Sequence, residues 1–326
     1  MFLSGISVVC FAASYAVALA LEVSRLFFRV PVRLVVMLGF AAAGLFAHTV
    51  YLTLRAQSSL AEGTPLSSWH DWYLLAAWIL AAVYLGLAAS RPQTTVGLFM
   101  LPLVLALVGV AWLFPGDVSF PRERASVIWG VIHGSMLLLG TVAVSFGFVA
   151  GLMYLVQSWR LKHKLPPKSG LKLPSLEWLQ TVNRQSLAYS SIFIAGGLLA
   201  GIVLNATKSA GPGGHVPWTD SVVIGSAVLL AWLLAASVFE WLYKPAQQGR
   251  KVAYLTVASF VFLAMVMALL VVSSEHASPR RTSVSLVPAA EEPRTQEPRT
   301  KVRIGIDSWF LDSWFLEFAS TREARA

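Results

Sequence analysis

Long apolar runs alternate with short polar loops over most of the chain. Runs of about 18 or more apolar residues can cross the roughly 30 Å hydrocarbon layer of a membrane. They lack the alternation of barrel strands, and backbone polar groups in lipid must be bonded within their own segment, so helices are predicted. The sequence therefore predicts an all-α, polytopic membrane helix bundle. We expect about eight transmembrane helices, near residues 2–21, 32–54, 72–89, 96–114, 127–156, 186–206, 221–243 and 252–273.

Composition agrees with this fold class. The 326 residues are 56% hydrophobic and 13% charged, which is more apolar surface than a soluble domain can bury. No basic segment precedes the first run and the positive charges follow it, so we expect an uncleaved span rather than a signal peptide. Cys10 is the single cysteine, which excludes an internal disulfide and a CxxC redox pair. Without a CxxCH motif, the chain does not carry c-type haem covalently.

The distribution of Lys and Arg predicts the orientation, because short loops rich in these residues stay on the cytoplasmic side. The opposite set of loops is poor in them, so we expect both termini and the loop at 211–220 to be extracytoplasmic. The net charge of +9 reflects this rule and a basic tail, and nucleic-acid binding does not follow from it. The cytoplasmic set is Arg25, Arg29, Arg33, Arg91, Arg160, Lys162, Lys164, Lys168, Lys172, Arg184, Lys244, Arg250 and Lys251, and the outer set is Arg55, Arg122, Arg124 and Lys208.

Three parts follow from these patterns. Residues 1–126 form an N-terminal four-helix membrane half, and residues 127–276 form a second membrane half with an outer WTD loop. Residues 277–326 are rich in Pro, Thr and charge and are predicted to be a disordered, basic extracytoplasmic tail. Between the fifth and sixth spans, "LPSLEWLQTVNRQ" has the spacing of a short interfacial helix, although the basic linker before it also serves to fix topology. Glycines four residues apart indicate close helix packing at Gly130/Gly134, Gly147/Gly151 and Gly197/Gly201.

Histidine placement carries the candidate chemistry. With the expected topology, five of the six histidines gather near the outer face, although they are far apart in sequence: His48, His70, His133, His215 and His276. A neutral imidazole is a good axial ligand for haem iron. We select His133 and His276, which lie at the outer ends of two spans, as the candidate pair. A histidine at a membrane interface can also be a plain amphipathic anchor, so this pattern leaves both interpretations open.

Aromatic and basic residues surround the candidate pair in sequence. Trp218, in the same loop as His215, and Trp129 are suited to contact a flat apolar macrocycle. Arg122 and Arg124 precede the fifth span on the outer side, where they could pair with haem propionates. His48 lies inside a span, where a polar group needs a partner, and is a further candidate ligand. Interface tryptophans are also ordinary membrane-belt residues.

These residues resemble a known family of integral membrane proteins. An outer histidine at the start of a span (His133), an outer tryptophan–aspartate segment ("PWTD", 217–220) and a second outer histidine (His276) are similar to the cytochrome c assembly family, the CcsA/CcmC/HemX-like group. Supporting matches are "LPSLEWL", "GGLLAGIVLN" and "QGRKVAYLTVASF". One Trp precedes the aspartate instead of a string, which places the chain nearest the HemX-like branch. The resemblance covers roughly residues 127–276.

The resemblance implies haem handling in cytochrome c biogenesis. Haem b would be held transiently and non-covalently by His133 and His276 at the outer face, with Trp218 and Asp220 shaping the site, and presented to apocytochrome c. The implied partner is a ResB/CcsB-like synthesis subunit, and the implied location is the bacterial inner (cytoplasmic) membrane. The chain itself would be a non-catalytic or synthase subunit, because the thioether chemistry belongs to haem and its CxxCH peptide.

Two alternatives remain open from the sequence. A HemX-like membrane regulator of tetrapyrrole synthesis would act through the cytoplasmic segment 160–184. A transporter of haem or a small solute is the other, and the scarcity of ionisable residues in span centres argues against an ion-coupled mechanism.

Overall fold

The computed structural model describes residues 7–28, 32–61, 68–114, 127–164, 171–207, 217–242 and 250–272. The chain divides into two compact units, Met1–Arg281 and Thr282–Ala326, and every described residue lies in the first. The described part is all-helical, with no strand in it. Its helices are α1 (Val8–Ser24), α2 (Arg33–Ala61), α3 (Trp69–Ser90), α4 (Gly97–Ala111), α5 (Val127–Lys162), α6 (Leu176–Thr207), α7 (Ser221–Leu242) and α8 (Arg250–Val272).

Length and hydropathy make this a multi-pass membrane protein. Six of the described helices, α2, α3 and α5 to α8, are long and apolar enough to span a membrane. α1 and α4 are apolar but shorter, with 17 and 15 residues. At a rise of about 1.5 Å per residue, α1 and α4 reach roughly 25 Å, a little under the thickness of a typical hydrocarbon core. The predicted all-α membrane bundle is confirmed, and each expected span overlaps one of these helices.

Helix ends differ from the expectation where the backbone stays helical beyond the apolar run. α5 has 36 residues, so it is about 54 Å long and continues past the membrane thickness to the basic residues Arg160 and Lys162. α6 begins at Leu176, so the expected short interfacial helix is the first part of α6 rather than a separate element. Leu179 and Val182 in that part are buried, which explains why the helix does not break there.

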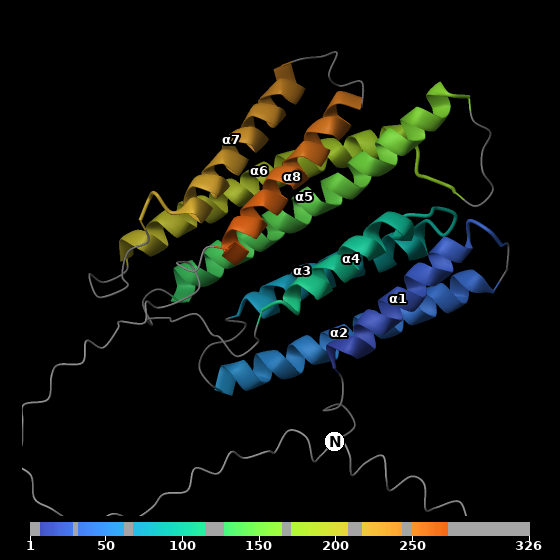
Figure 1. Cartoon of the computed structure of the whole chain (residues 1–326), viewed down its shortest axis with the longest axis horizontal. Coiled ribbons are helices and arrows are strands. Elements are labelled where there is room, and N and C mark those ends of the chain that lie inside the picture. The colour runs from blue at the N-terminus through green and yellow to red at the C-terminus, as the bar shows by residue number, and fades with distance from the viewer. Residues whose placement is uncertain are drawn as a thin grey trace, which may run out of the picture. The chain divides into compact units, whose positions relative to one another are not determined.

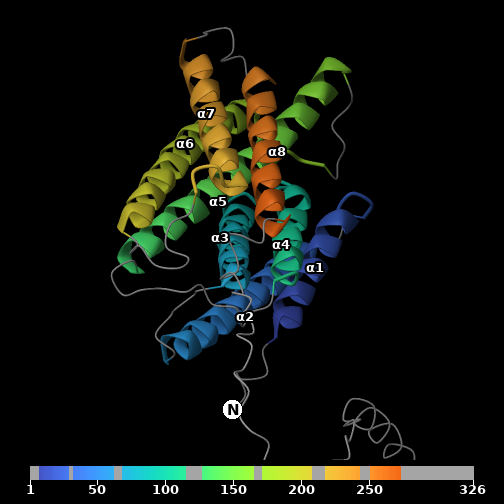
Figure 2. The ribbon, with the colours of Figure 1, turned by 60° about the vertical axis from the view of Figure 1, so that its left-hand side comes forward.

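The helices pack as two groups (Figures 1 and 2). In the first, α1 contacts α2 and α4, and α3 contacts α2 and α4. In the second, α5 packs along α6 and α8, and α7 packs against α6 and α8. α5 also contacts α3 and α4 and so joins the two groups. Glycines make the closest approaches: a Cβ on Gly140 of α5 would lie 2.7 Å from Ile194 Cδ1 of α6.

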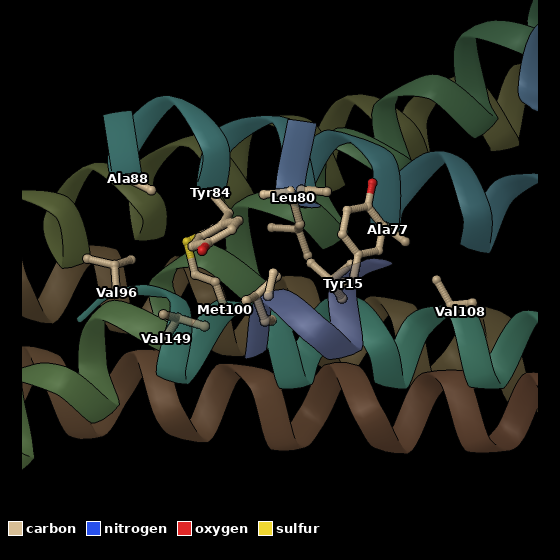
Figure 3. Close-up of a cluster of buried hydrophobic side chains, with 14 of the residues drawn as sticks. Tyr15, Ala77, Leu80, Tyr84, Ala88, Val96, Met100, Val108 and Val149 are labelled. Atoms are coloured by element: carbon tan, nitrogen blue, oxygen red, sulfur yellow. The ribbon is translucent and has the colours of Figure 1, made fainter. Parts of the chain in front are cut away.

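A continuous apolar core fills the space between α1, α3 and α4 and reaches α5 (Figure 3). Tyr84 from α3 and Met100 from α4 point toward one another there, and Val149 of α5 lies beside them. Tyr84 and Met100 are each 1% exposed. In a bundle whose outside faces lipid, this close packing rather than hydrophobicity alone must hold the helices together.

Polar contacts join the two groups at the far end of α5 from His133. The guanidinium of Arg25, at the end of α1, donates to the backbone carbonyls of Pro92, Gln93 and Thr94 in the α3–α4 loop. Thr95 N–H then donates to the carbonyl of Lys172, 2.8 Å away, in the segment that leads into α6. The Arg25 bonds hold the α3–α4 loop to α1, and the Thr95 bond joins that loop to the second group.

Candidate functional site

His133 lies in the second turn of α5 and faces α6. Its Nδ1 is 2.6 Å from the carbonyl oxygen of Gly197. A carbonyl only accepts, so Nδ1 carries the proton and donates it. In a neutral ring, the lone pair then belongs to Nε2. A histidine that binds a metal through one nitrogen typically donates its other N–H in this way, which fixes both tautomer and ring orientation.

Two glycines of α6 let α5 approach closely around His133. A Cβ on Gly201 would lie 2.8 Å from both Cε1 and Nδ1 of His133, closer than side chains tolerate. A Cβ on Gly197 would lie 2.5 Å from Leu137 Cδ2, one turn further along α5. The pair that the sequence identifies as a packing motif therefore also seats His133: Gly197 supplies the acceptor and Gly201 supplies the space. The four-residue spacing of Gly197 and Gly201 predicted close helix packing, but it did not indicate that His133 would be the residue packed against them.

Trp129 and Trp218 both present their rings to the surroundings. Trp129 is four residues before His133, so the two side chains share a face of α5. It is 37% exposed, and Trp218, in the turn before α7, is 64% exposed. Their exposure is compatible with contact to a planar ligand, which stays a prediction, and equally with a role as membrane-interface residues.

Asp220 has a structural task that the sequence analysis did not assign. It is 5% exposed, and its Oδ1 accepts from the N–H groups of Val222 at 2.8 Å and Val223 at 3.2 Å. These are the orphan donors of the first turn of α7, so Asp220 is its N-cap. An aspartate directly before an apolar run is a standard helix-start signal, and it was present in the sequence. The cap also fixes the direction in which the 217–220 turn enters α7.

The predicted site residues that surround His133 lie at one end of the second helix group. α5 and α7 begin at the end of their group where α6 and α8 finish (Figure 1). His133, Trp129, Trp218 and Asp220 belong to these ends. The other predicted site residues, namely His215, His276, Arg122 and Arg124, lie outside the described residues. The pairing of His133 with His276 therefore stays a prediction.

His48 is buried in the first helix group, away from the residues around His133. It is 0% exposed and stacks on Phe11, with ring centroids 4.0 Å apart and planes 2° from parallel. Its Nδ1 lies 3.4 Å from the hydroxyl of Tyr15, which is the partner that a polar group inside a span requires. Its Nε2 is buried and has no hydrogen-bond partner among the described residues. A buried unsatisfied atom of this kind calls for a physical reason.

His70 belongs to a fully bonded polar network at the start of α3. Its Nδ1 is 2.9 Å from the carbonyl of Ala111, at the end of α4, and its Nε2 is 3.3 Å from the hydroxyl of Tyr51. The Nδ1–H donates to the carbonyl, so the tyrosine hydroxyl donates to Nε2. Both ring nitrogens are thus used in joining α2, α3 and α4, and His70 has a structural role.

Next to His70, a capping box begins α3. The Ser68 hydroxyl accepts from Asp71 N–H, and Asp71 accepts from Ser68 in return. Asp71, 2% exposed, also forms an ion pair with Arg55 of α2. The motif "SSWHD" carries the S-x-x-D spacing of such a cap, so the sequence contained this signal as well.

Comparison with known proteins gives one informative match. The chain is 27% identical over 157 residues to "Cytochrome c biogenesis protein CcsA" of Gloeobacter violaceus, covering 46% of this chain and 45% of that protein. The chain resembles the cytochrome c assembly family. This confirms the resemblance that the residue patterns predict. The match spans less than half the length of the CcsA protein. No family model and no solved structure matches the chain.

The described residues offer one imidazole of the kind that could hold a haem iron. Proteins hold haem iron through one or two side chains, often histidines, rather than through a cluster of ligands. Within the described ranges, no group of three or more His, Cys, Asp or Glu side chains converges as a metal site. Among the described residues at the ends where α5 and α7 begin, His133 supplies an oriented imidazole, with a half-buried ring and a fixed tautomer.

Proposed function

We propose that this protein is a haem-binding membrane factor in cytochrome c biogenesis, which holds haem b non-covalently at the outer membrane face for delivery to apocytochrome c. Two independent lines support the proposal. One is the similarity to the CcsA protein of Gloeobacter violaceus. The other, which carries the argument, is the orientation of His133: its Nδ1–H donates to the carbonyl of Gly197, which places the lone pair of the neutral ring on Nε2.

In this proposal, His133 and His276 would hold the haem iron. α6 orients His133 before any ligand arrives, so little ring freedom would be lost on binding. Trp129 and Trp218 would contact the porphyrin, and Arg122 and Arg124 would pair with its propionates. Haem supplies the vinyl groups and iron of the later thioether chemistry, while the protein binds and orients it.

Asp220 acts indirectly in this scheme. As the N-cap of α7, it fixes the turn that holds Trp218 next to the helix start. His215, which precedes this turn in the sequence, would contribute to the same haem site. The proposed location is the inner membrane of a bacterium with both termini extracytoplasmic, and the proposed partner is a ResB/CcsB-like synthesis subunit.

Haem reconstitution of the full chain in detergent tests the proposal. The wild-type protein should show a Soret absorption band after excess haem is removed, and His133→Gly should lose most of it. External imidazole should partly restore the band in His133→Gly, because it replaces the missing ligand without changing the fold. Loss of the band in His276→Ala tests the second ligand in the same way.

His163 offers a matched control on the same helix. It lies just beyond the other end of α5, is exposed, and its Nδ1 likewise donates to a backbone carbonyl, that of Trp159 at 2.9 Å. His163→Gly should leave the Soret band unchanged. If His133→Gly and His163→Gly behave alike, the ligand role of His133 is wrong, whether both keep the band or both lose it.

A further inference from the structure

A groove between α1 and α2 carries a second inference, independent of the haem proposal. It lies where α1 ends and α2 begins, at the end of the bundle opposite to His133, and its volume is about 330 Å³. Its lining is almost wholly apolar, with one charged residue, and consists of Leu21, Ser24, Phe28, Val32, Arg33 and Val36.

The apolar residues of the groove face outward. Phe28 is 67% exposed, Val32 is 60% exposed and Val36 is 40% exposed. At the end of a membrane helix, such side chains are within reach of the acyl chains of lipids. The serine in the lining does not add a free donor, because the Ser24 hydroxyl donates to the carbonyl of Leu21, 2.8 Å away.

Two arginines near the groove differ in what they bind. Arg25 is committed to the fold, since its guanidinium donates to three carbonyls of the α3–α4 loop and lies 4.0 Å from Glu22. Arg33 makes no hydrogen bond or ion pair with any part of the chain that the structure describes. Glu22 attracts Arg33 electrostatically but is 1% exposed and closer to Arg25. The positive charge of Arg33 at the groove is therefore available to an external anion.

We propose that this groove binds one phospholipid with an anionic headgroup. One acyl chain lies along Leu21, Phe28, Val32 and Val36, and the headgroup phosphate pairs with Arg33. Basic pockets between membrane helices on the cytoplasmic side are suited to anionic lipids, which are enriched in that leaflet. The predicted orientation places this end of α1 and α2 on that side.

The lining favours an anionic lipid over an apolar helix of a partner protein. An apolar helix would place no negative charge beside Arg33, whereas an anionic phospholipid supplies an acyl chain for the apolar lining and a phosphate for the guanidinium.

Native mass spectrometry of the full chain, released from detergent with equal amounts of phosphatidylglycerol and phosphatidylcholine, tests this proposal. The wild type should retain phosphatidylglycerol with a preference of about fivefold, the contribution typical of one basic residue at a membrane surface. Arg33→Gln should abolish the preference. Lys162→Gln, which removes an exposed charge at the end of α5, should leave it intact.

Val36→Trp supplies a second, independent variant. The larger ring fills the groove from an exposed position, so retention of both lipids should fall. A preference that survives Arg33→Gln, or that falls equally in Lys162→Gln, would show that the lipid responds to overall charge and overturn the site. Unchanged lipid retention in Val36→Trp would place the acyl chain elsewhere and overturn it too.

Discussion

The imidazole Nδ1 of His133 on α5 lies 2.6 Å from the carbonyl oxygen of Gly197 on α6. A helical carbonyl that already accepts from the N–H four residues later has a second lone pair, and His133 uses it. The orientation of this side chain is therefore set by the neighbouring helix. The orientation of the imidazole therefore depends on the close packing of α5 on α6.

Gly201→Ala should displace the His133 ring from its position against α6. The new Cβ would lie 2.8 Å from two atoms of the imidazole, so the ring or the helix must move. We expect a loss of about 1–3 kcal/mol in the free energy of unfolding from overpacking. If His133 binds haem, the Soret band should also weaken. Unfolding in detergent, followed by circular dichroism, and haem absorbance measure the two effects.

Gly196→Ala is the matched control on the same helix. A Cβ at Gly196 would meet Met136 Sδ at 3.6 Å, an ordinary van der Waals contact with a flexible side chain. Replacing a helical glycine by alanine favours the helix by up to about 1 kcal/mol. Stability and haem absorbance should therefore be kept or improved. Equal losses in both variants would mean that the α5–α6 packing, and not the His133 seat, is the sensitive feature.

Asp220 can be tested as a cap separately from any role at the haem. Asp220→Ala removes the acceptor for Val222 and Val223 N–H and should cost about 1 kcal/mol of stability. Asp220→Asn keeps an acceptor and should recover most of that loss. We expect Asp220→Asn to keep the haem absorbance as well. If its melting temperature is normal but the band is lost, the carboxylate charge acts directly at the site.

The helices were predictable because lipid imposes one strong rule on the sequence. Apolar runs of sufficient length located all eight described helices. Their ends were less predictable: the start of α6 at Leu176 depends on the burial of Leu179 and Val182 against the core, which hydropathy cannot show. Local signals for the caps of α3 and α7, at Ser68 and Asp220, were present but had not been used.

The candidate site was predictable in its residue types but not in its contacts. An outer histidine and a tryptophan–aspartate segment identify His133, Trp218 and Asp220 from sequence. The acceptor for His133 is a main-chain carbonyl of Gly197, and a carbonyl leaves no side-chain signature. The partner of His48, Tyr15, is 33 residues away on another helix, and that pairing depends on how α1 lies against α2.

The ion pair of Arg55 with Asp71 should be necessary for the stability of the first helix group. Asp71 is 2% exposed, so Arg55→Met leaves a carboxylate buried without its cation. We expect a loss of about 3 kcal/mol in the free energy of unfolding. Asp71→Asn in the same chain removes the stranded charge and preserves an acceptor for the cap. The double variant should therefore melt at a higher temperature than Arg55→Met alone, and the opposite order would contradict the assignment.

His48 offers a prediction that distinguishes a structural from a ligand role. In either tautomer of its contact with Tyr15, the buried Nε2 has no hydrogen-bond partner in the part of the chain that the structure describes, and such an atom costs about 1–3 kcal/mol. Phenylalanine keeps the stack on Phe11 and removes this cost, although it also leaves the Tyr15 hydroxyl unbonded.

For a purely structural His48, His48→Phe should therefore change the melting temperature by no more than a few degrees and leave the haem spectrum unaltered. Tyr15→Phe/His48→Phe removes both polar groups and should melt higher than His48→Phe. If His48 instead coordinates haem inside the membrane, His48→Phe should shift the Soret band or halve its intensity. Tyr15→Phe should then keep a normal band. Haem reconstitution of these three variants, compared with His133→Gly, decides between the two roles. Nε2 of His48 is either an unsatisfied atom that destabilises the fold or a second ligand of the haem iron.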